Sequence, residues 1–219
     1  MRVDLLYPPI TDPTPGYHSL SYLAGYAKVR GYTDIHLRDT NIEALHYSLD
    51  HAEEVLAAAR IRRDDLVALG PALDERGAAE LTGLVAVDHI DAGELRRAVE
   101  ILRSPDEFYD LTRYRWAVDR INGWMAFQWA AFPRLISDGF DVHPRGHINV
   151  CSTEELRDAE RLERLNAPLA RYYNERLLPE LLAARPEIVG INVTYLQQLP
   201  FALWMARLLR AAGVAKWLV

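Results

Sequence analysis

Cysteine is nearly absent from this sequence, in which Cys151 is the single one among 219 residues. One cysteine cannot form an internal disulfide, and it cannot supply the several thiolates of an iron–sulfur cluster or a Cys-rich zinc site. Long apolar runs are also missing, because no stretch approaches the ~18 continuous apolar residues of a membrane-spanning helix. The N-terminal segment MRVDLLYPP has no apolar region long enough for a signal peptide. We therefore expect a cytoplasmic protein that does not span a membrane.

Clusters of positive charge are missing as well. The formal net charge is −6, and phosphate backbones are bound by clustered Lys and Arg, so we expect no large nucleic-acid interface. The arginines alternate with acidic residues, as in EELRDAERLERL, which is typical of a solvated helix face with i,i+4 ion pairs. Neither a Gly-rich phosphate loop nor a nucleophile elbow occurs. Half of the residues are apolar, which is enough for a buried core in a chain of this length.

The first and last parts of the chain alternate between strand and helix patterns. Short apolar or β-branched runs predict strands in RVDLLY, DIHLRDTNI, EIVGINVTY and AKWLV. Apolar residues at helical spacing predict helices at about 19–30 and 200–212. Ser19 is the expected N-cap of the first helix, and Gly31 and Gly213 are expected just past the two helix ends. This order of elements predicts βαβ units with right-handed crossovers.

The middle of the chain, residues 45–184, has helical spacing almost throughout. Helices are predicted in HAEEVLAAARI, AGELRRAVEIL, YRWAVDRINGWMAFQWAAF and STEELRDAERLERL. No strand is predicted there, and TGLVAVDHI is ambiguous by periodicity. The predicted fold class is α/β, a doubly wound, Rossmann-like parallel sheet of about four strands. Residues 1–44 and 185–219 form this sheet, and residues 45–184 interrupt it as a long helical insertion.

Ligands of such sheets bind at the carboxyl ends of the strands. The connections expected there are the Pro-rich loop 8–17, the turn 39–41 and the turn 194–198. Asp39 and Asn41 can contact a ribose or an amide, or they can cap the following helix. Thr194 and Gln198 can bind a ligand, or they can be a turn cap and an exposed side chain. The fold alone does not name the ligand.

Three stretches, taken in order, are similar to a known family. They are LLYPPITDPTPGYHSLSYLAGYAKVRGY followed closely by RDTNIEAL, then SPDEFYDLTRYRWAVDRIN, then LPELLAARPEIVGINVTYLQQLPFALWMARLLRAAG. Their order and spacing resemble the N-terminal, cobalamin-binding region of cobalamin-dependent radical S-adenosylmethionine enzymes, many of which are methyltransferases. The resemblance covers nearly the whole chain. It implies that cobalamin lies on the carboxyl edge of the sheet, with its nucleotide tail between the sheet and the helices.

The resemblance also implies which residues bind the cofactor. The matching positions are Pro8, Pro9, Ile10, Asn41, Thr194, Tyr195 and Gln198. It implies no catalytic residue and no metal ligand in this chain. The expected partners are cobalamin and a radical S-adenosylmethionine domain or subunit.

Two features of the family are missing. The family follows its fourth strand with a Gly-Gly pair and a fifth strand, whereas this sequence ends at Val219. The family then continues into a barrel domain whose Cys-x3-Cys-x2-Cys motif binds an iron–sulfur cluster, which one cysteine cannot do. We therefore interpret the sequence as a truncated form, with one half of a split enzyme as the alternative. The cluster and S-adenosylmethionine belong to the missing domain or partner.

DVHPRG, from Asp141 to Gly146, has the Asp-x-His-x-x-Gly pattern that supplies the lower axial ligand to cobalt in other cobalamin enzymes. No strand is predicted before it, so we interpret it as a surface turn.

His89 lies beside two aspartates, but carboxylates adjacent in sequence point apart on a helix, which disfavours a metal site. Cys151 is expected to be a packed or partly exposed thiol.

Aromatic side chains can line a corrin or form a core, and at helical spacing the core is the more typical role. Those considered are Trp116, Trp124, Trp129 and Phe132 in the insertion, and Tyr7 and Tyr17 beside the first loop.

The hypothesis for function is a cobalamin-binding module of a radical S-adenosylmethionine methyltransferase that is not catalytic alone. The alternative is a non-catalytic interaction subunit, or the partner half of a split enzyme, that does not bind cobalamin. A third class, such as a nucleotide-sugar transferase, is disfavoured because diphosphate-binding signatures are missing.

Overall fold

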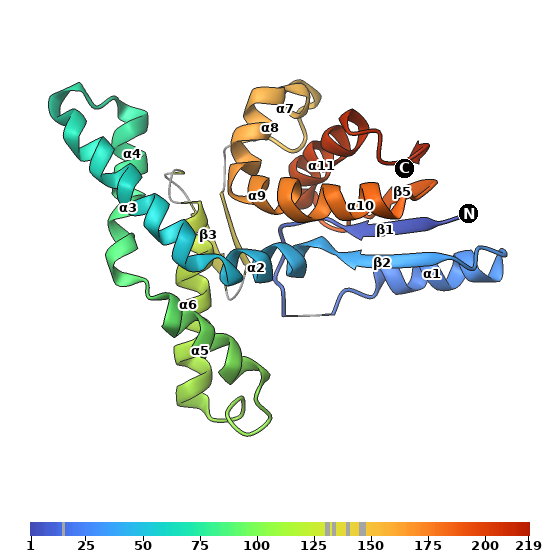
Figure 1. Ribbon diagram of the computed structural model, residues 1–219, viewed down its shortest axis with the longest axis horizontal. Coiled ribbons are helices and arrows are strands. Elements are labelled where there is room, and N and C mark those ends of the chain that lie inside the picture. The colour runs from blue at the N-terminus through green and yellow to red at the C-terminus, as the bar shows by residue number, and fades with distance from the viewer. Residues whose placement is uncertain (15, 130–131, 133–134, 139–140, 145–147) are drawn as a thin grey trace. The chain divides into compact units, whose positions relative to one another are not determined.

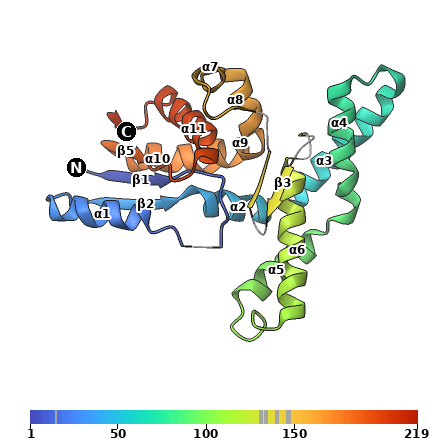
Figure 2. The same cartoon turned by 180° about the vertical axis from the view of Figure 1, so that it is seen from behind.

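A computed structural model describes residues 1–14, 16–129, 132, 135–138, 141–144 and 148–219 of the chain. The chain divides into two compact units, which are Met1–Ala44 with Gly146–Val219, and Leu45–Arg145. Figures 1 and 2 show the first and last parts of the chain side by side in the first unit. The predicted insertion, 45–184, begins at the observed boundary. It ends too late, however, because the second unit stops at Arg145.

The first unit contains a four-stranded parallel sheet in the order β2-β1-β5-β6. Its strands are β1 (Val3–Tyr7), β2 (Ile35–Asp39), β5 (Ile188–Ile191) and β6 (Trp217–Leu218). The chain moves from β1 to β2 in one direction across the sheet and from β5 to β6 in the other. Right-handed crossovers in opposite directions place their helices on opposite faces. The predicted α/β, doubly wound, Rossmann-like fold class is therefore confirmed.

The helices of the first unit follow the apolar spacing of the sequence. They are α1 (Ser19–Val29), the start of α2 (Thr40–Asp50), α7 (Thr153–Arg157), α8 (Ala159–Asn166), α9 (Ala170–Tyr172), α10 (Leu178–Ala184) and α11 (Leu199–Ala211). Helix α1 buries Leu20 and Ala24. It begins without a side-chain cap, so the predicted Ser19 cap is wrong. Gly31 has φ +93° and Gly213 has φ +65°, as expected for residues that end a helix.

Residues 148–184 group with the sheet because their helices bury apolar faces in the first unit. Helix α8 packs against α11, and its Leu162 and Leu165 are buried. The helical pattern of STEELRDAERLERL is therefore correct, but pattern alone does not show which core receives the apolar face.

The second unit is mainly helical and has a core of its own. Its helices are the rest of α2, α3 (Ala52–Leu69), α4 (Glu75–Leu84), α5 (Ala92–Arg103) and α6 (Leu111–Gln128), with a short 3₁₀ turn at Gly70–Ala72 and another at Val85–His89. Helix α5 buries Leu95, Ala98 and Ile101 at three-residue intervals and packs against α6. The ambiguous stretch TGLVAVDHI is the end of α4 and the second 3₁₀ turn.

A hairpin follows α6 in the second unit, where no strand was predicted. Strand β3 (Leu135–Asp138) pairs antiparallel with β4 (Asp141–Pro144). The interpretation of DVHPRG as a surface turn is therefore wrong for its first four residues, which form β4. Its remaining residues, Arg145 and Gly146, lie outside the described part of the chain. Four-residue strands are too short for periodicity to separate them from loops.

Candidate functional site

The candidate site lies where the direction of the crossovers reverses, between the carboxyl ends of β1 and β5. Leu6 pairs with Ile191 in register, and the backbone N–H of Asn192 donates to the carbonyl of Leu6 at 2.9 Å. At such a reversal the loops after the two central strands diverge toward opposite faces and leave a crevice. We call the loops that follow β1 and β5, residues 8–18 and 192–198, the edge loops.

The loop after β1 is fixed by side chains from the start of α2. Thr40 Oγ1 donates to the carbonyl of Tyr7 at 2.6 Å. Asn41 binds both backbone groups of Thr11, accepting from its N–H at 3.1 Å and donating to its carbonyl at 3.0 Å. All three of these contacts are buried, where a hydrogen bond is costly to lose. Asn41 therefore positions the loop.

Gln198 joins the two edge loops. Its Oε1 accepts from the backbone N–H groups of Thr194 and Tyr195, each at 3.0 Å, and its Nε2 donates to the carbonyl of Pro8 at 2.6 Å. The side chain is fully buried. Polar atoms that cross-link two loops in this way make their relative position rigid. We call Thr40, Asn41 and Gln198 the clamp.

The seven residues predicted to bind the cofactor divide into two groups. Pro8, Pro9, Ile10, Asn41 and Gln198 are buried, and they shape and fix the edge loops. Thr194 and Tyr195 are exposed on the outer side of the second loop. Only these last two present side chains to a ligand at the surface. The alternative interpretation of Gln198 as an exposed side chain is wrong, because its amide is hydrogen-bonded to backbone groups of both loops.

Aromatic and polar side chains surround the junction of the loops. We call Tyr17, Ser19, Asn192, Thr194 and Tyr195 the rim. The rings of Tyr7 and Tyr17 stack with centroids 4.6 Å apart, and Tyr17 meets the ring of Tyr195 edge-on at 5.9 Å. Asn192 Nδ2 donates to Ser19 Oγ at 2.6 Å and to Thr194 Oγ1 at 3.3 Å. The rim therefore combines flat apolar rings with hydroxyl and amide groups.

Two hydroxyl groups beneath the rim have no hydrogen-bond partner of ordinary geometry among the described residues, although the side chains of Thr11 and Thr194 lie near enough to Tyr7 to influence its pKa. The two groups are Tyr7 Oη and Thr11 Oγ1, and both are buried. Burial raises the pKa of Tyr7 to about 12, with the neighbouring hydroxyls of Thr11 and Thr194 partly opposing it. Tyr7 is therefore a neutral hydrogen-bond donor at physiological pH. A buried hydroxyl without a partner costs roughly 1–3 kcal/mol.

Asp39 ends β2 at the same edge but works as a helix cap. Its Oδ1 accepts from the backbone N–H groups of Asn41 and Ile42, each at 3.1 Å. Burial raises the pKa of this carboxyl above its ordinary value, and the two backbone donors oppose the rise. Of the two roles considered for Asp39, the geometry supports the cap.

The aromatic residues considered from the sequence of the insertion belong to the second unit. Trp124 is fully buried, and its Nε1 donates to Ser48 Oγ at 3.0 Å, while Trp129 is also buried. Phe132 and Trp116 are half-buried, and Arg120 stacks on the ring of Trp116. These positions support the core interpretation of the aromatic residues.

No metal site is formed within the described ranges. No group of three or more His, Cys, Asp or Glu side chains converges there, and Cys151 is an exposed thiol. Among the same residues, no helix is both long and apolar enough to cross a membrane.

Sequence reasoning missed Thr11 beneath the rim and Asn192 in it, and it considered Ser19 only as a helix cap. Thr11 lies inside the Pro-rich loop and could have been noticed, because a polar residue between a buried strand and a helix often faces the strand edge. Asn192 lies in EIVGINVTY, a nine-residue stretch with a strand pattern, and so it was predicted as part of a strand. Only Ile188–Ile191 of this stretch form β5.

The fold and this edge together define a parallel, Rossmann-like α/β unit with a pre-formed switch-point edge. Comparison with protein-family models, curated proteins and solved structures finds no match for the chain.

Proposed function

We propose that the chain is a cofactor-binding module that takes cobalamin at the edge loops and contributes no catalytic group of its own. The observation that supports this most directly is the pair of buried hydroxyls, Tyr7 Oη and Thr11 Oγ1, which lie beneath an exposed rim and have no partner of ordinary geometry in the part of the chain that the structure describes. The proposal also depends on the resemblance of the loops after β1 and β5 to cobalamin-binding radical S-adenosylmethionine enzymes.

The residues at the edge suit the chemistry of this ligand. A corrin is a broad, largely apolar ring with amide groups around its margin, and it carries a nucleotide tail. The rings of Tyr17 and Tyr195 offer flat apolar surface. Thr194 and Asn192 offer donors and acceptors for amides at the surface, and the hydroxyls of Tyr7 and Thr11 lie buried beneath them. The clamp keeps these groups in place before binding, which lowers the entropy lost on association.

The role of the chain is to bind and orient the cofactor. When bound, cobalamin supplies methyl-transfer chemistry that side chains cannot provide. A single cysteine cannot bind a four-iron cluster, so a radical S-adenosylmethionine domain or partner subunit would have to supply that centre. We therefore place the chain as one part of a methyltransferase.

The test is an absorption spectrum of the protein after incubation with hydroxocobalamin and desalting. We expect the wild-type chain to retain the corrin bands. Thr194→Trp should weaken binding at least about tenfold because the indole fills the space beside the rim, whereas Thr194→Ser should bind normally. His143→Ala should leave both the affinity and the cobalt spectrum unchanged, because His143 belongs to β4 of the other unit.

Two results would contradict the proposal. One is a wild-type protein that folds but retains no corrin after desalting. The other is a cobalt spectrum that changes with His143→Ala while Thr194→Trp has no effect, which would identify DVHPRG as the ligand motif.

One observation favours the alternative function, a non-catalytic interaction subunit. Val193, Tyr195 and Leu196 are exposed next to each other on the second edge loop. Exposed apolar groups of this kind also suit a protein interface. The absence of corrin binding, together with specific binding of a partner protein that Leu196→Lys abolishes, would favour this function.

A further inference from the structure

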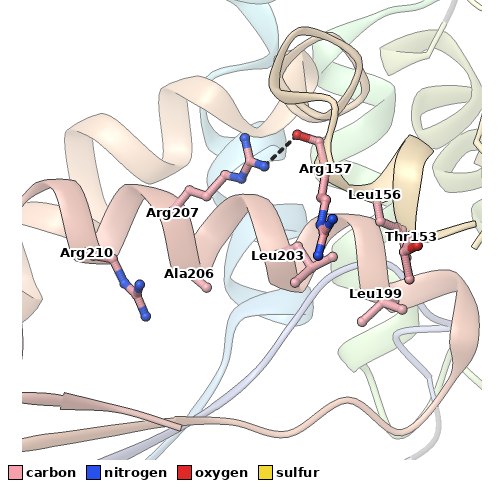
Figure 3. A pocket seen from close by; sticks show the side chains of 8 residues that line it. All are labelled: Thr153, Leu156, Arg157, Leu199, Leu203, Ala206, Arg207 and Arg210. Atoms are coloured by element: carbon pink, nitrogen blue, oxygen red, sulfur yellow. Dashed lines mark hydrogen bonds between the residues drawn. The ribbon is translucent and has the colours of Figure 1, made fainter.

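A groove lies between α7 and α11 in the first unit, and no proposed function accounts for it. It encloses about 510 Å³ and is lined by Thr153, Leu156, Arg157, Leu199, Leu203, Ala206, Arg207 and Arg210 (Figure 3). Its lining therefore consists of aliphatic side chains and three arginines. A volume of this order is within the range of small-molecule sites.

The three arginines have no acidic partner among the residues that the structure describes. Arg207 Nη2 donates to the carbonyl of Arg157 at 2.7 Å, which joins α11 to α7. Neither Arg157 nor Arg210 forms a hydrogen bond or an ion pair from its side chain within the described part of the chain. Most arginines elsewhere do pair with carboxylates, as Arg62 does with Glu80. Three unneutralised guanidinium groups on one groove are thus unusual in a chain of net charge −6.

Two of the three groove arginines lie toward one end, and the third lies beside the leucines. Figure 3 shows Arg207 and Arg210 toward one end, Leu156 and Leu199 at the other, and the Arg157 side chain crossing between them near Leu203. At 1.5 Å per residue, Leu199 and Arg210 are about 16 Å apart along α11. A ligand that matches this lining has an anionic group for the guanidinium groups and a hydrocarbon part for the leucines.

We propose that the groove binds a single-chain amphiphilic anion, with a phosphate or carboxylate head that bonds the groove arginines and an alkyl tail along Leu203 and Leu199. Guanidinium groups remain charged at all physiological pH values and bind both kinds of head through paired N–H donors. The leucines disfavour a free inorganic anion, because they would stay exposed to water. The net negative charge disfavours an anionic membrane surface.

The groove is separate from the proposed cobalamin site. It begins at Leu199, one residue after the clamp residue Gln198, but it is lined by α7 and by the side of α11 that faces it. The inference therefore does not depend on the proposed function, and either can fail without the other.

The test is isothermal titration calorimetry of the full chain with decyl phosphate and with decanoate below their micellar concentrations. We expect saturable binding of at least one of them at one site per chain. Lengthening the tail from eight to ten carbons should strengthen binding about two- to fourfold per methylene. Inorganic phosphate and decanol should each bind at least about tenfold more weakly, because each offers only half of the required chemistry.

Variants locate the site. Arg210→Gln and Arg157→Gln should each weaken binding of the charged amphiphile roughly five- to tenfold. Leu203→Gln should reduce the dependence on tail length. Arg115→Gln is the matched control, because Arg115 is an exposed arginine of the other unit, and it should leave the affinity unchanged. Both groove arginines tested are exposed, so the variants should melt at the wild-type temperature.

Several outcomes would overturn the inference. These are no saturable binding by either amphiphile, equal binding of inorganic phosphate, and the same loss of affinity in Arg115→Gln as in Arg210→Gln. Binding only to anionic vesicles would also overturn the inference, because it would identify a membrane site. Displacement of decyl phosphate by hydroxocobalamin would do the same, because it would make the groove a part of the cofactor site.

Discussion

At the scale of single residues, Gln198 and Thr194 show how two polar side chains after the same strand take opposite roles. Both follow β5 by a few residues, and the resemblance assigned both to ligand binding. Gln198 is long enough to reach the backbone of the other loop, and there its amide bonds two N–H groups and a carbonyl. Thr194 is short and remains exposed at the rim. Side-chain reach therefore separates the clamp residue from the residue open to a ligand.

Replacing Gln198 tests the clamp directly. Gln198→Leu keeps the apolar volume but leaves the N–H groups of Thr194 and Tyr195 and the carbonyl of Pro8 without their partner. We expect the free energy of unfolding to fall by about 2–4 kcal/mol, measured by urea denaturation. We also expect weaker cobalamin binding if the proposed function is correct.

The neighbouring Gln197 provides the control. It is half-buried, and no side-chain hydrogen bond to it is formed among the described residues. Gln197→Leu should change the free energy of unfolding by less than about 0.5 kcal/mol. Equal losses in the two variants would show that the amide of Gln198 has no special role.

At the scale of elements, the outer strand β6 is an edge strand with exposed apolar side chains. It pairs with β5 on one side, and it ends the strand order of the described sheet on the other. Trp217 is 63% exposed on this strand and Val219 beyond it is 79% exposed. An edge strand with exposed apolar side chains can pair with another chain.

We expect the 219-residue chain to self-associate through this edge. Trp217→Lys should shift the sedimentation velocity profile toward monomer, because a lysine on an edge strand opposes pairing. Tyr22→Lys is the control, since Tyr22 is 77% exposed on α1 but is not part of a strand. A wild-type protein that sediments as a monomer at all concentrations would contradict this expectation.

The helices and the short strands differed in how well the sequence predicted them. Helices α3, α5 and α6 repeat their apolar residues over several turns, so the pattern was strong enough to identify each of them. Strands β3 and β4 have four residues each, too few for a period of two to be distinguished from chance. The predicted end of the insertion at 184 failed for a different reason, because amphipathic helices do not indicate which core they join.

At the scale of the whole molecule, each unit has its own core. Leu95 of α5 belongs to the apolar cluster of the second unit, and Met205 of α11 is fully buried in the first. Truncating a buried side chain removes apolar contacts and leaves a cavity, at a cost of about 2–5 kcal/mol. Separate cores should lose this stability separately.

Hydrogen exchange measured by mass spectrometry can check this. Leu95→Ala should increase exchange in α5 and α6 while β1 and β5 keep their wild-type protection. Met205→Ala should do the reverse. If either variant increased exchange equally in both units, the two cores would have to be treated as one cooperative system.

The sequence by itself determined the fold class, the long helices and the edge of the sheet at which to look for a ligand. These features depend on local periodicity and on the general rule that parallel strands present their carboxyl ends to ligands. The tertiary structure alone decided which residues at that edge are open. Pro8, Asn41 and Gln198 became buried because loops distant in sequence supply partners for their backbone or side-chain groups. It also decided that Arg157 and Arg210 border one groove, because a side chain's neighbours depend on how helices pack and not on the order of residues along the chain.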